Sequence, residues 1–208
     1  MIFSLNIDTL NNFHKTYRLI EVISEDLILD EIERIQHDFE DMDVEVRCEE
    51  SFDEFDIGGR KIRLVKRSTI KLPFWLAVFL EEEKYVTILN PPKIDRIILN
   101  TKRVEEEKNP YKLQDIDKYF YLSAKKTYQE LVEKGKMASA KDKETMEKEL
   151  FRLLRMRLPK IVKMAETDGI NISSQSRNLT PEERWLCKLI ANAVNKWSKT
   201  VNFDIESD

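Results

Sequence analysis

The sequence contains very little glycine and histidine, and this scarcity argues against several classes of enzyme. Only 4 of its 208 residues are glycine, and neither G-x-x-x-x-G-K nor G-x-G-x-x-G occurs. The chain therefore lacks the loops that bring backbone N–H groups close to phosphates in the two large nucleotide-binding classes. Its two histidines are His14, near the terminus, and His37, in a predicted exposed helix turn. We expect both to be surface residues rather than general bases.

Cysteine and long apolar runs are equally scarce. Cys48 and Cys187 stand far apart and form no C-x-x-C pair, so neither a zinc site nor a disulfide framework is expected. The longest apolar run, Leu72–Leu80, is about half of the ~20 residues that a membrane helix needs. No basic region leads into an apolar run near Met1. We therefore expect a cytoplasmic protein with no membrane contact, no metal and no cofactor.

Charged residues are abundant and mixed in sign. The 35 basic and 39 acidic side chains are interspersed and give a net charge of −4, which is typical of helix surfaces and not of a protein that follows phosphates over its whole surface. An acidic run covers Asp38–Asp56 and is most simply a solvated loop. Docking of a basic partner is one alternative for it. A metal-dependent enzyme using Asp53, Glu54 and Asp56 is another, although no D-x-D-x-D-G loop is present.

The first part of the chain is predicted to contain strands. Residue types and spacing predict a strand at 17–23, a helix from 26 to about 42 and a short strand at 44–46. Gly58 and Gly59 predict the turn of a hairpin between 55–57 and 61–66. Pro73 is expected to open an apolar helix at 72–82, and a strand at 86–89 precedes the double proline Pro91–Pro92.

The second part is predicted to be helical. Apolar spacing predicts helices at 94–108, 116–135 and 141–165, the last kinked or broken by Pro159. The third of these is expected to bury one face, made by Met146, Leu150, Leu154, Leu158, Ile161 and Ala165. Thr180 as N-cap, Pro181 and the capping-box residue Glu183 predict the start of a fourth helix. The fold class is therefore α+β, mainly α: a small β-containing N-terminal domain (1–92), a four-to-five-helix bundle domain (93–201) and an acidic tail (202–208).

Two kinds of surface are candidates for binding. Arg152, Arg155, Lys160 and Lys163 fall on one arc of the third helix, which makes them a candidate nucleic-acid or partner face. No helix-turn-helix, zinc-finger or RNP pattern accompanies them. Four aromatic side chains fit either a core or a protein interface, because interfaces favour aromatic anchors: Phe74, Trp75, Phe79 and Trp185.

Two motifs resemble one family. Leu72–Pro92 reads LPFWLAVFLEEEKYVTILNPP and Ser176–Trp197 reads SRNLTPEERWLCKLIANAVNKW. Together with the aromatic residues Tyr119–Tyr121, they resemble GINS DNA-replication subunits of the archaeal two/three type, in which a small β domain precedes the helical one. The resemblance covers roughly the second two-thirds of the chain. Met1–Arg67 departs from it, being longer and carrying the extra helix and the acidic run.

The resemblance implies a non-catalytic scaffold in the replicative helicase. Such a subunit joins the MCM motor to a RecJ-like protein, contacts primase or polymerase, and assembles with a second GINS subunit of reversed domain order, two copies of each. The implied domain or interface anchors are Leu72, Pro73, Trp75, Leu76, Phe79, Tyr119, Phe120, Trp185, Leu189 and Trp197. The first five are expected to hold the small domain together and against the helical one. The main alternative is a DNA-binding accessory protein that uses the basic face from Arg152 to Lys163.

Overall fold

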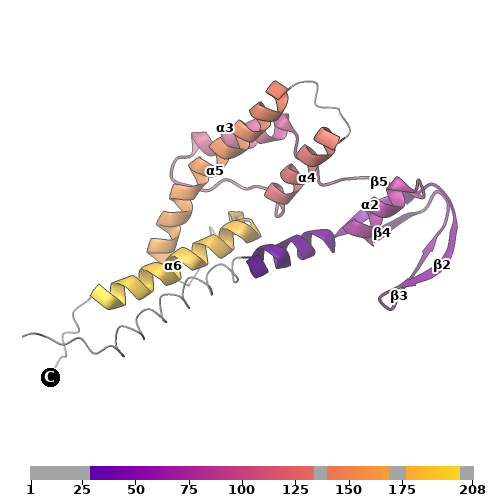
Figure 1. The fold of residues 1–208 in the computed structure, drawn as a ribbon, viewed down its shortest axis with the longest axis horizontal. Helices are drawn as coiled ribbons and strands as arrows, with labels where there is room; N and C mark the ends of the chain where they lie inside the picture. The colour runs from indigo at the N-terminus through magenta and orange to yellow at the C-terminus, as the bar shows by residue number, and fades with distance from the viewer. Residues whose placement is uncertain (1–28, 134–139, 169–176, 202–208) are drawn as a thin grey trace, which may run out of the picture. The chain divides into compact units, whose positions relative to one another are not determined.

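A computed structural model describes residues 29–133, 140–168 and 177–201 (Figure 1). The chain forms two compact units, 1–38 and 39–208. In the first unit the description starts within a helix that spans 29–40, which confirms the predicted helix there. The predicted strand at 17–23 and the acidic tail lie outside the described residues. The predicted domain boundary after Pro92 falls within the second unit and stays a prediction.

A three-stranded antiparallel sheet begins the second unit. Its order is β4 (Thr69–Pro73), β1 (Asp43–Cys48), β5 (Val86–Ile88). The central strand β1 alternates exposed and buried residues, and its Val46 lies opposite Ile70 of β4 and Ile88 of β5. The predicted strands at 44–46 and 86–89 are therefore confirmed.

The strand β4 was not predicted, and it changes the start of the next helix. Leu72 and Pro73 pair with β1, so α2 (Phe74–Glu82) begins two residues later than the sequence suggested. Pro73 has φ −53° and ψ 141°, which is an extended conformation outside the helix. Proline has no N–H to donate to a neighbouring strand, so in sheets it is found mainly on edge strands, and Pro73 lies at the end of the edge strand β4. The N–H of Phe74 instead donates to the Met42 carbonyl at 2.9 Å.

The predicted hairpin is confirmed. It consists of β2 (Phe52–Ile57) and β3 (Arg60–Leu64), joined by Gly58 (φ 60°) and Gly59 (φ 84°). A turn with two consecutive residues at positive φ matches the right-handed twist of the strands. Glycine adopts positive φ at little energetic cost, because it has no Cβ. The Asp56 carboxylate accepts from the Gly59 N–H at 2.8 Å and closes the turn.

The acidic run is partly neutralised by the basic residues that flank it. Glu54 pairs with Lys61 and Glu50 with Lys66, each at 2.8 Å and exposed to solvent. No group of three or more His, Cys, Asp or Glu side chains in the described part of the chain is arranged to hold a metal ion. Glu50 and Glu54 of the acidic run are therefore used in surface ion pairs, which contribute little to stability.

The helix α2 covers the sheet with one face only. Phe74, Leu76, Ala77 and Leu80 are buried, and the Phe74 ring meets Phe39 edge-on at 5.3 Å. Phe39 also contacts Tyr119 at 5.5 Å, so the sheet core includes a residue from the segment before α4. Trp75 and Phe79 are exposed on the opposite face.

Four helices follow the sheet among the described residues. They are α3 (Arg96–Lys108), α4 (Phe120–Glu133), α5 (Ala140–Asp168) and α6 (Pro181–Val201). The start predicted for α6 is confirmed, because the Glu183 N–H donates to the Thr180 hydroxyl at 3.3 Å and the Thr180 N–H donates to the Glu183 carboxylate at 3.1 Å. The start predicted for α4 is wrong: Ile116 is buried in the preceding loop, and the helix begins at Phe120.

The long helix α5 connects two clusters of the helical core (Figure 1). Met146 and Leu153 in its first half pack in the cluster that contains Leu99 of α3 and Phe120 of α4. In its second half, Ile161 and its neighbours pack with residues of α6. The chain is thus α+β and mainly α, with the sheet before the helices, as the sequence predicted.

Two expectations about α5 are corrected by the structure. Pro159 does not break the helix, which runs from Ala140 to Asp168 through this residue, and a kink there stays a prediction. A proline in a helix interior costs about 3 kcal/mol, and here the packing of both halves offsets that cost. The predicted apolar face is correct at its ends, where Met146, Ile161 and Ala165 are buried. It is wrong in the middle of the helix, because Leu154 and Leu158 are exposed whereas Leu153 and Arg157 are buried. Steps of four residues rotate by about 40° each on a helix of 3.6 residues per turn, so a run of such steps drifts away from the buried side.

Candidate functional site

The centre of the helical part is a buried ionic network around Arg157 of α5. The side chain of Arg157 has 0% exposure and makes a bidentate pair with Glu183 of α6, from Nε at 2.6 Å and from Nη2 at 2.8 Å. Its Nη1 donates to Glu106 of α3 at 2.8 Å. One guanidinium therefore binds carboxylates from two other helices.

Every N–H of this guanidinium has an acceptor. Besides the carboxylates, Nη1 donates to the Gln114 carbonyl at 2.9 Å and Nη2 to the Asn178 carbonyl at 2.7 Å. Arginine carries five N–H groups, and five hydrogen bonds are present. Burial alone would lower the pKa of Arg157, but the hydrogen bonds and charges of its carboxylate partners hold that pKa above its ordinary value. The side chain is consequently a fixed cation inside the domain.

Lys160 belongs to the same network and not to an exposed basic face. Its ammonium binds the Glu106 carboxylate and also donates to the carbonyls of Glu106 at 3.1 Å, Asn109 at 2.6 Å and Lys112 at 3.2 Å. These carbonyls lie at and just beyond the C-terminal end of α3, where backbone acceptors lack helical partners. The prediction that Lys160 lies on the candidate binding face is therefore wrong.

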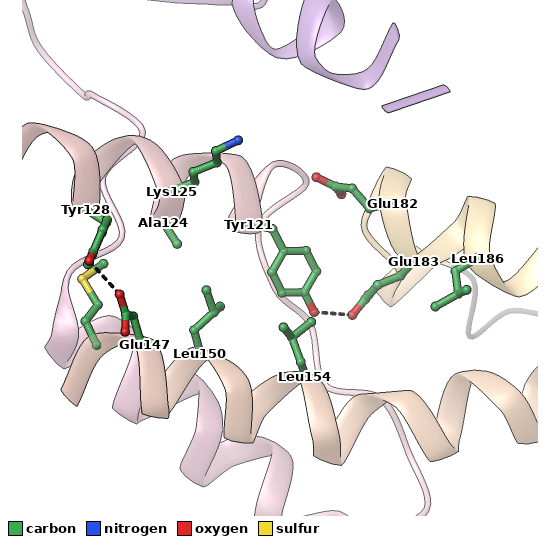
Figure 2. Close-up of a pocket in the computed structure, with 11 residues that line it drawn as sticks. Tyr121, Ala124, Lys125, Tyr128, Glu147, Leu150, Leu154, Glu182, Glu183 and Leu186 are labelled. Atoms are coloured by element: carbon green, nitrogen blue, oxygen red, sulfur yellow. Dashed lines mark hydrogen bonds between the residues drawn. The ribbon is translucent and has the colours of Figure 1, made fainter. Parts of the chain in front are cut away.

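Tyr121 brings α4 into the network. Its hydroxyl donates to Glu183 at 2.5 Å (Figure 2). Burial raises the pKa of Tyr121 well above its ordinary value, and the charge of Glu183 raises it further. The phenol thus stays a hydrogen-bond donor at neutral pH. The network therefore joins four helices through hydrogen bonds and paired charges. Each of its ionised groups is already bound by a partner, so the network has a structural role.

The other three residues of the predicted basic face are exposed on α5: Arg152, Arg155 and Lys163. Arg152 is exposed and pairs with Glu149 at 3.0 Å. Arg155 lies over the ring of Phe151 at 4.9 Å, and the Lys163 ammonium lies 6.0 Å from the Tyr111 ring centre. The candidate face is therefore smaller than predicted and is mixed with aromatic surface.

The predicted anchor residues divide into buried and exposed groups. Leu72, Leu76, Tyr119 and Phe120 are buried in the cores described above. Pro73 and Trp185 are half-buried. The exposed ones are Trp75, Phe79, Leu189 and Trp197. Trp75 and Phe79 therefore do not help to hold the sheet core together, and an interface role for the exposed group stays a prediction.

Two helices carry rows of apolar side chains that are exposed to solvent in the described part of the chain. On α5, Phe151, Leu154 and Leu158 are 57%, 40% and 46% exposed at spacings of three and four residues. On α6, Leu189, Trp197 and Val201 are exposed, Trp197 to 65%. Side chains at these spacings share one side of a helix. We call the first set the α5 row and the second the α6 row.

A cleft of about 460 Å³ lies where α4, α5 and α6 meet (Figure 2). Its apolar lining comes from all three helices and consists of Ala124, Met146, Leu150, Leu154 and Leu186, with aliphatic and ring portions of Tyr121 and Tyr128. Leu154 belongs to both the cleft and the α5 row. The polar groups around it include Lys125, Glu147, Glu182 and Glu183. The Tyr128 hydroxyl donates to Glu147 at 2.7 Å.

Glu182 differs from the other acids at this cleft. Both of its carboxylate oxygens are buried, and the Thr180 hydroxyl and the Glu182 amide approach this carboxylate without reaching good hydrogen-bond geometry. Burial raises the pKa of the Glu182 carboxyl above its ordinary value, and the Thr180 hydroxyl and the amide of Glu182 itself counteract this only in part. Sequence analysis did not single out Glu182 for binding, since its position in the first helical turn already accounts for an acidic residue there.

No described helix has the length and apolar character required to cross a membrane. A search of curated proteins returned no match for the chain. A family model described as the GINS complex protein helical bundle domain matches residues 94–202, which is just over half of the chain. The matched segment contains α3 to α6, with the buried network and both exposed rows. The chain therefore belongs to the family of GINS complex proteins, which act in DNA replication together with other GINS subunits.

Proposed function

We propose that this chain is a non-catalytic scaffold subunit of the GINS complex, of the archaeal type in which a small β domain precedes the helical domain. The chain order supports the type, since β1 to β5 occupy residues 43–88 and the matched helical domain follows. In this proposal the partner is a second GINS subunit of reversed domain order, with two copies of each chain in a heterotetramer. The complex links the MCM motor to a RecJ-like protein and contacts primase or polymerase.

The observation that carries the proposal is the exposure of the α5 and α6 rows. Six large apolar side chains on the surface of two neighbouring helices exceed the scattered single residues that a monomer shows. Trp and Phe are the side chains that dominate the energetics of protein interfaces. The rows lie on a framework fixed by the Arg157 network, so they are presented on a rigid surface. An obligate interface of a few thousand Å² would cover surfaces of this kind.

The proposal is tested by assembly. We expect the purified chain, coexpressed with the second GINS subunit of its source organism, to elute as one complex whose light-scattering mass equals two copies of each chain. The double variant Leu154→Glu, Leu158→Glu places charges in the α5 row and should abolish the complex. Exchange of the exposed ion-pair partners Glu144 and Lys148 on the same helix is the matched control and should leave the mass unchanged. A wild-type chain that stays alone beside its partner would refute the proposal.

The links to the motor are tested separately. We expect the assembled complex, and not the isolated chain, to retain the MCM motor and the RecJ-like protein on an affinity column. Retention of neither protein by an intact GINS complex would remove this part of the proposal and leave the subunit assignment in place.

A DNA-binding accessory function has less support. Of its four predicted residues, Lys160 is turned inward and Arg152 is paired with Glu149. Binding of duplex DNA by the isolated chain, falling steeply between low and moderate salt and lost in Arg155→Gln, would favour it nonetheless.

A further inference from the structure

The helix α2 is apolar on every side, although only one of its sides is covered. Its first seven residues, 74–80, are all apolar, and four of them are buried against the sheet core. On the opposite side, Trp75 and Phe79 are 42% and 57% exposed. A helix at a protein surface normally carries polar residues on its outer side, and a helix that is apolar all round is normally buried. The outer side of α2 therefore has the composition of a surface that another molecule covers.

Two acidic residues continue this outer side. Glu82 and Glu83 follow Phe79 by three and four residues, which places them beside it on the helix, and both are exposed. Neither side chain has an ion-pair or hydrogen-bond partner among the described residues. Glu81 differs from them, because its carboxylate accepts from the Ile88 N–H at 2.9 Å. The structure of the small sheet therefore accounts for Glu81 but not for the two acids after it.

The position of these two acids is unfavourable for α2 itself. The C-terminal end of a helix carries a partial negative charge, which repels Glu82 and Glu83, and the last turn of α2 contains no basic residue. The next cation along the chain is Lys84, which is exposed and has no ion-pair partner in the part of the chain that the structure describes. A cation supplied by a partner would therefore compensate both carboxylates and the helix end.

We propose that the outer side of α2 receives an amphipathic helix of a replisome protein that is not a GINS subunit. This helix sets aliphatic side chains against Trp75 and Phe79, and lysine or arginine side chains beside Glu82 and Glu83. The inference rests on the proposed function and adds the surface and the chemistry by which a further partner is held.

Three observations choose this occupant. The two unpaired carboxylates require basic residues in it, and the apolar pair requires an apolar side. The patch lies on one helix of nine residues, which is the size of contact that a single amphipathic helix makes. α2 also precedes residues 94–202, which contain the α5 and α6 rows. Docking on α2 would therefore leave those rows to the other GINS subunits.

The test titrates the assembled GINS complex with the MCM motor and with the RecJ-like protein of the source organism. Phe79→Glu places a charge within the apolar patch, and the double variant Glu82→Lys, Glu83→Lys reverses the charge beside it. We expect both variants to assemble with unchanged mass and to raise the Kd for one of the two proteins at least about tenfold. The control is Glu133→Lys, Glu166→Lys, which makes the same change of net charge at exposed acids on α4 and α5 and should alter neither value.

The stability of the isolated full-length chain separates a partner's cation from one within the chain. The double variant Glu82→Lys, Glu83→Lys should unfold at the same or a higher temperature than wild type, because the C-terminal end of a helix favours cations. A lower unfolding temperature in this variant and in Lys84→Met would show that Lys84 already pairs with these acids. That result would overturn the inference.

Each outcome of the titrations has a definite meaning. If the wild-type complex binds either protein and both variants bind it equally well, the inference is wrong and the proposed function stands. If the wild-type complex binds neither protein, the inference falls together with the links to the motor, and the subunit assignment stands. Weaker binding in only one of the two variants also overturns the inference, since it requires both the apolar and the charged contacts. A change of mass in either variant would make α2 a contact between GINS subunits and would overturn it as well.

Discussion

Removal of the Arg157 side chain should be among the most damaging single substitutions in the helical domain. Arg157→Met preserves much of the volume and all helix propensity, but it leaves two buried carboxylates, Glu106 and Glu183, without their shared cation. Breaking a buried ion pair by removing one partner costs about 3–5 kcal/mol. For a chain of this size, each kcal/mol corresponds to roughly 2–4 °C in Tm, so we expect a loss of about 6–20 °C.

The cause of that loss can be separated from a simple packing defect. The double variant Arg157→Met, Glu183→Gln removes the carboxylate that has lost its only cation, since Glu106 keeps its ion pair with Lys160. It also keeps the capping box, because glutamine serves at that position as well. It should recover part of the lost stability. Arg155→Met on the same helix is the control and should stay within about 0.5 kcal/mol of wild type, because Arg155 is exposed.

Thermal unfolding followed by circular dichroism at 222 nm, supported by urea titration, measures both effects. A change below about 1 kcal/mol for Arg157→Met would refute the reasoning, since it would mean that the carboxylates find other compensation or that the network is not buried in solution. If the double variant is less stable than wild type by the sum of the losses of Arg157→Met and Glu183→Gln measured separately, the charge of Glu183 is not the cause.

Three further predictions concern helix ends, helix interiors and titration. Thr180→Ala should lower the free energy of unfolding by about 1–2 kcal/mol through loss of the buried cap on α6, as measured by urea titration; no change would show that the cap is dispensable. Pro159→Ala should raise it by at least about 1 kcal/mol, because alanine restores a helical N–H at an exposed site and removes the ring; a loss of stability would contradict this account of α5. The raised pKa of Glu182 means that its contribution to stability is fully present below the unfolded pKa and is lost as pH rises through the folded pKa. The stability gain of Glu182→Gln in the isolated chain should therefore appear as pH rises from about 4 to 7, and an equal effect at both ends would contradict it.

The sequence predicted best those features that are decided by neighbouring residues. Thr180 and Glu183 lie three positions apart and cap a helix by local hydrogen bonds, so the start of α6 was readable. The same holds for Gly58 and Gly59, whose positive φ values are local properties of a tight turn. The succession of a sheet and then helices followed from such local signals and from the resemblance to one family.

The features that the sequence did not predict depend on tertiary contacts. Nothing near Arg157 in the sequence distinguishes it from Arg155, two positions earlier, yet one is buried and the other exposed. The difference arises because residues 51 and 26 positions away supply the carboxylates. Lys160 was assigned to the surface for the same reason. The one available signal was that Arg157 lies four residues from both Leu153 and Ile161, which places it on a side of α5 that proves to be buried.

The residues that would form a binding surface are known only by their exposure. The family resemblance implied Leu189 and Trp197 as domain or interface anchors, and both are exposed, while their role in an interface stays a prediction. Two residues of the α5 row, Leu154 and Leu158, were predicted to be buried instead, because they continue an i+4 pattern of apolar residues. Sequence spacing identifies an apolar face but does not say whether the chain itself or a partner covers it.

Hydroxyl-radical footprinting of Phe151 and Trp197, alone and after addition of the second GINS subunit, tests the central claim most directly. Both side chains are more than half exposed in the isolated chain and should be labelled readily there. The account predicts that both side chains are strongly protected from labelling in the assembled complex. Exposed Tyr111 lies outside both rows, so its labelling serves as the internal reference. Equal labelling of Phe151 and Trp197 in the free chain and in the complex would contradict the claim that partner subunits cover these rows.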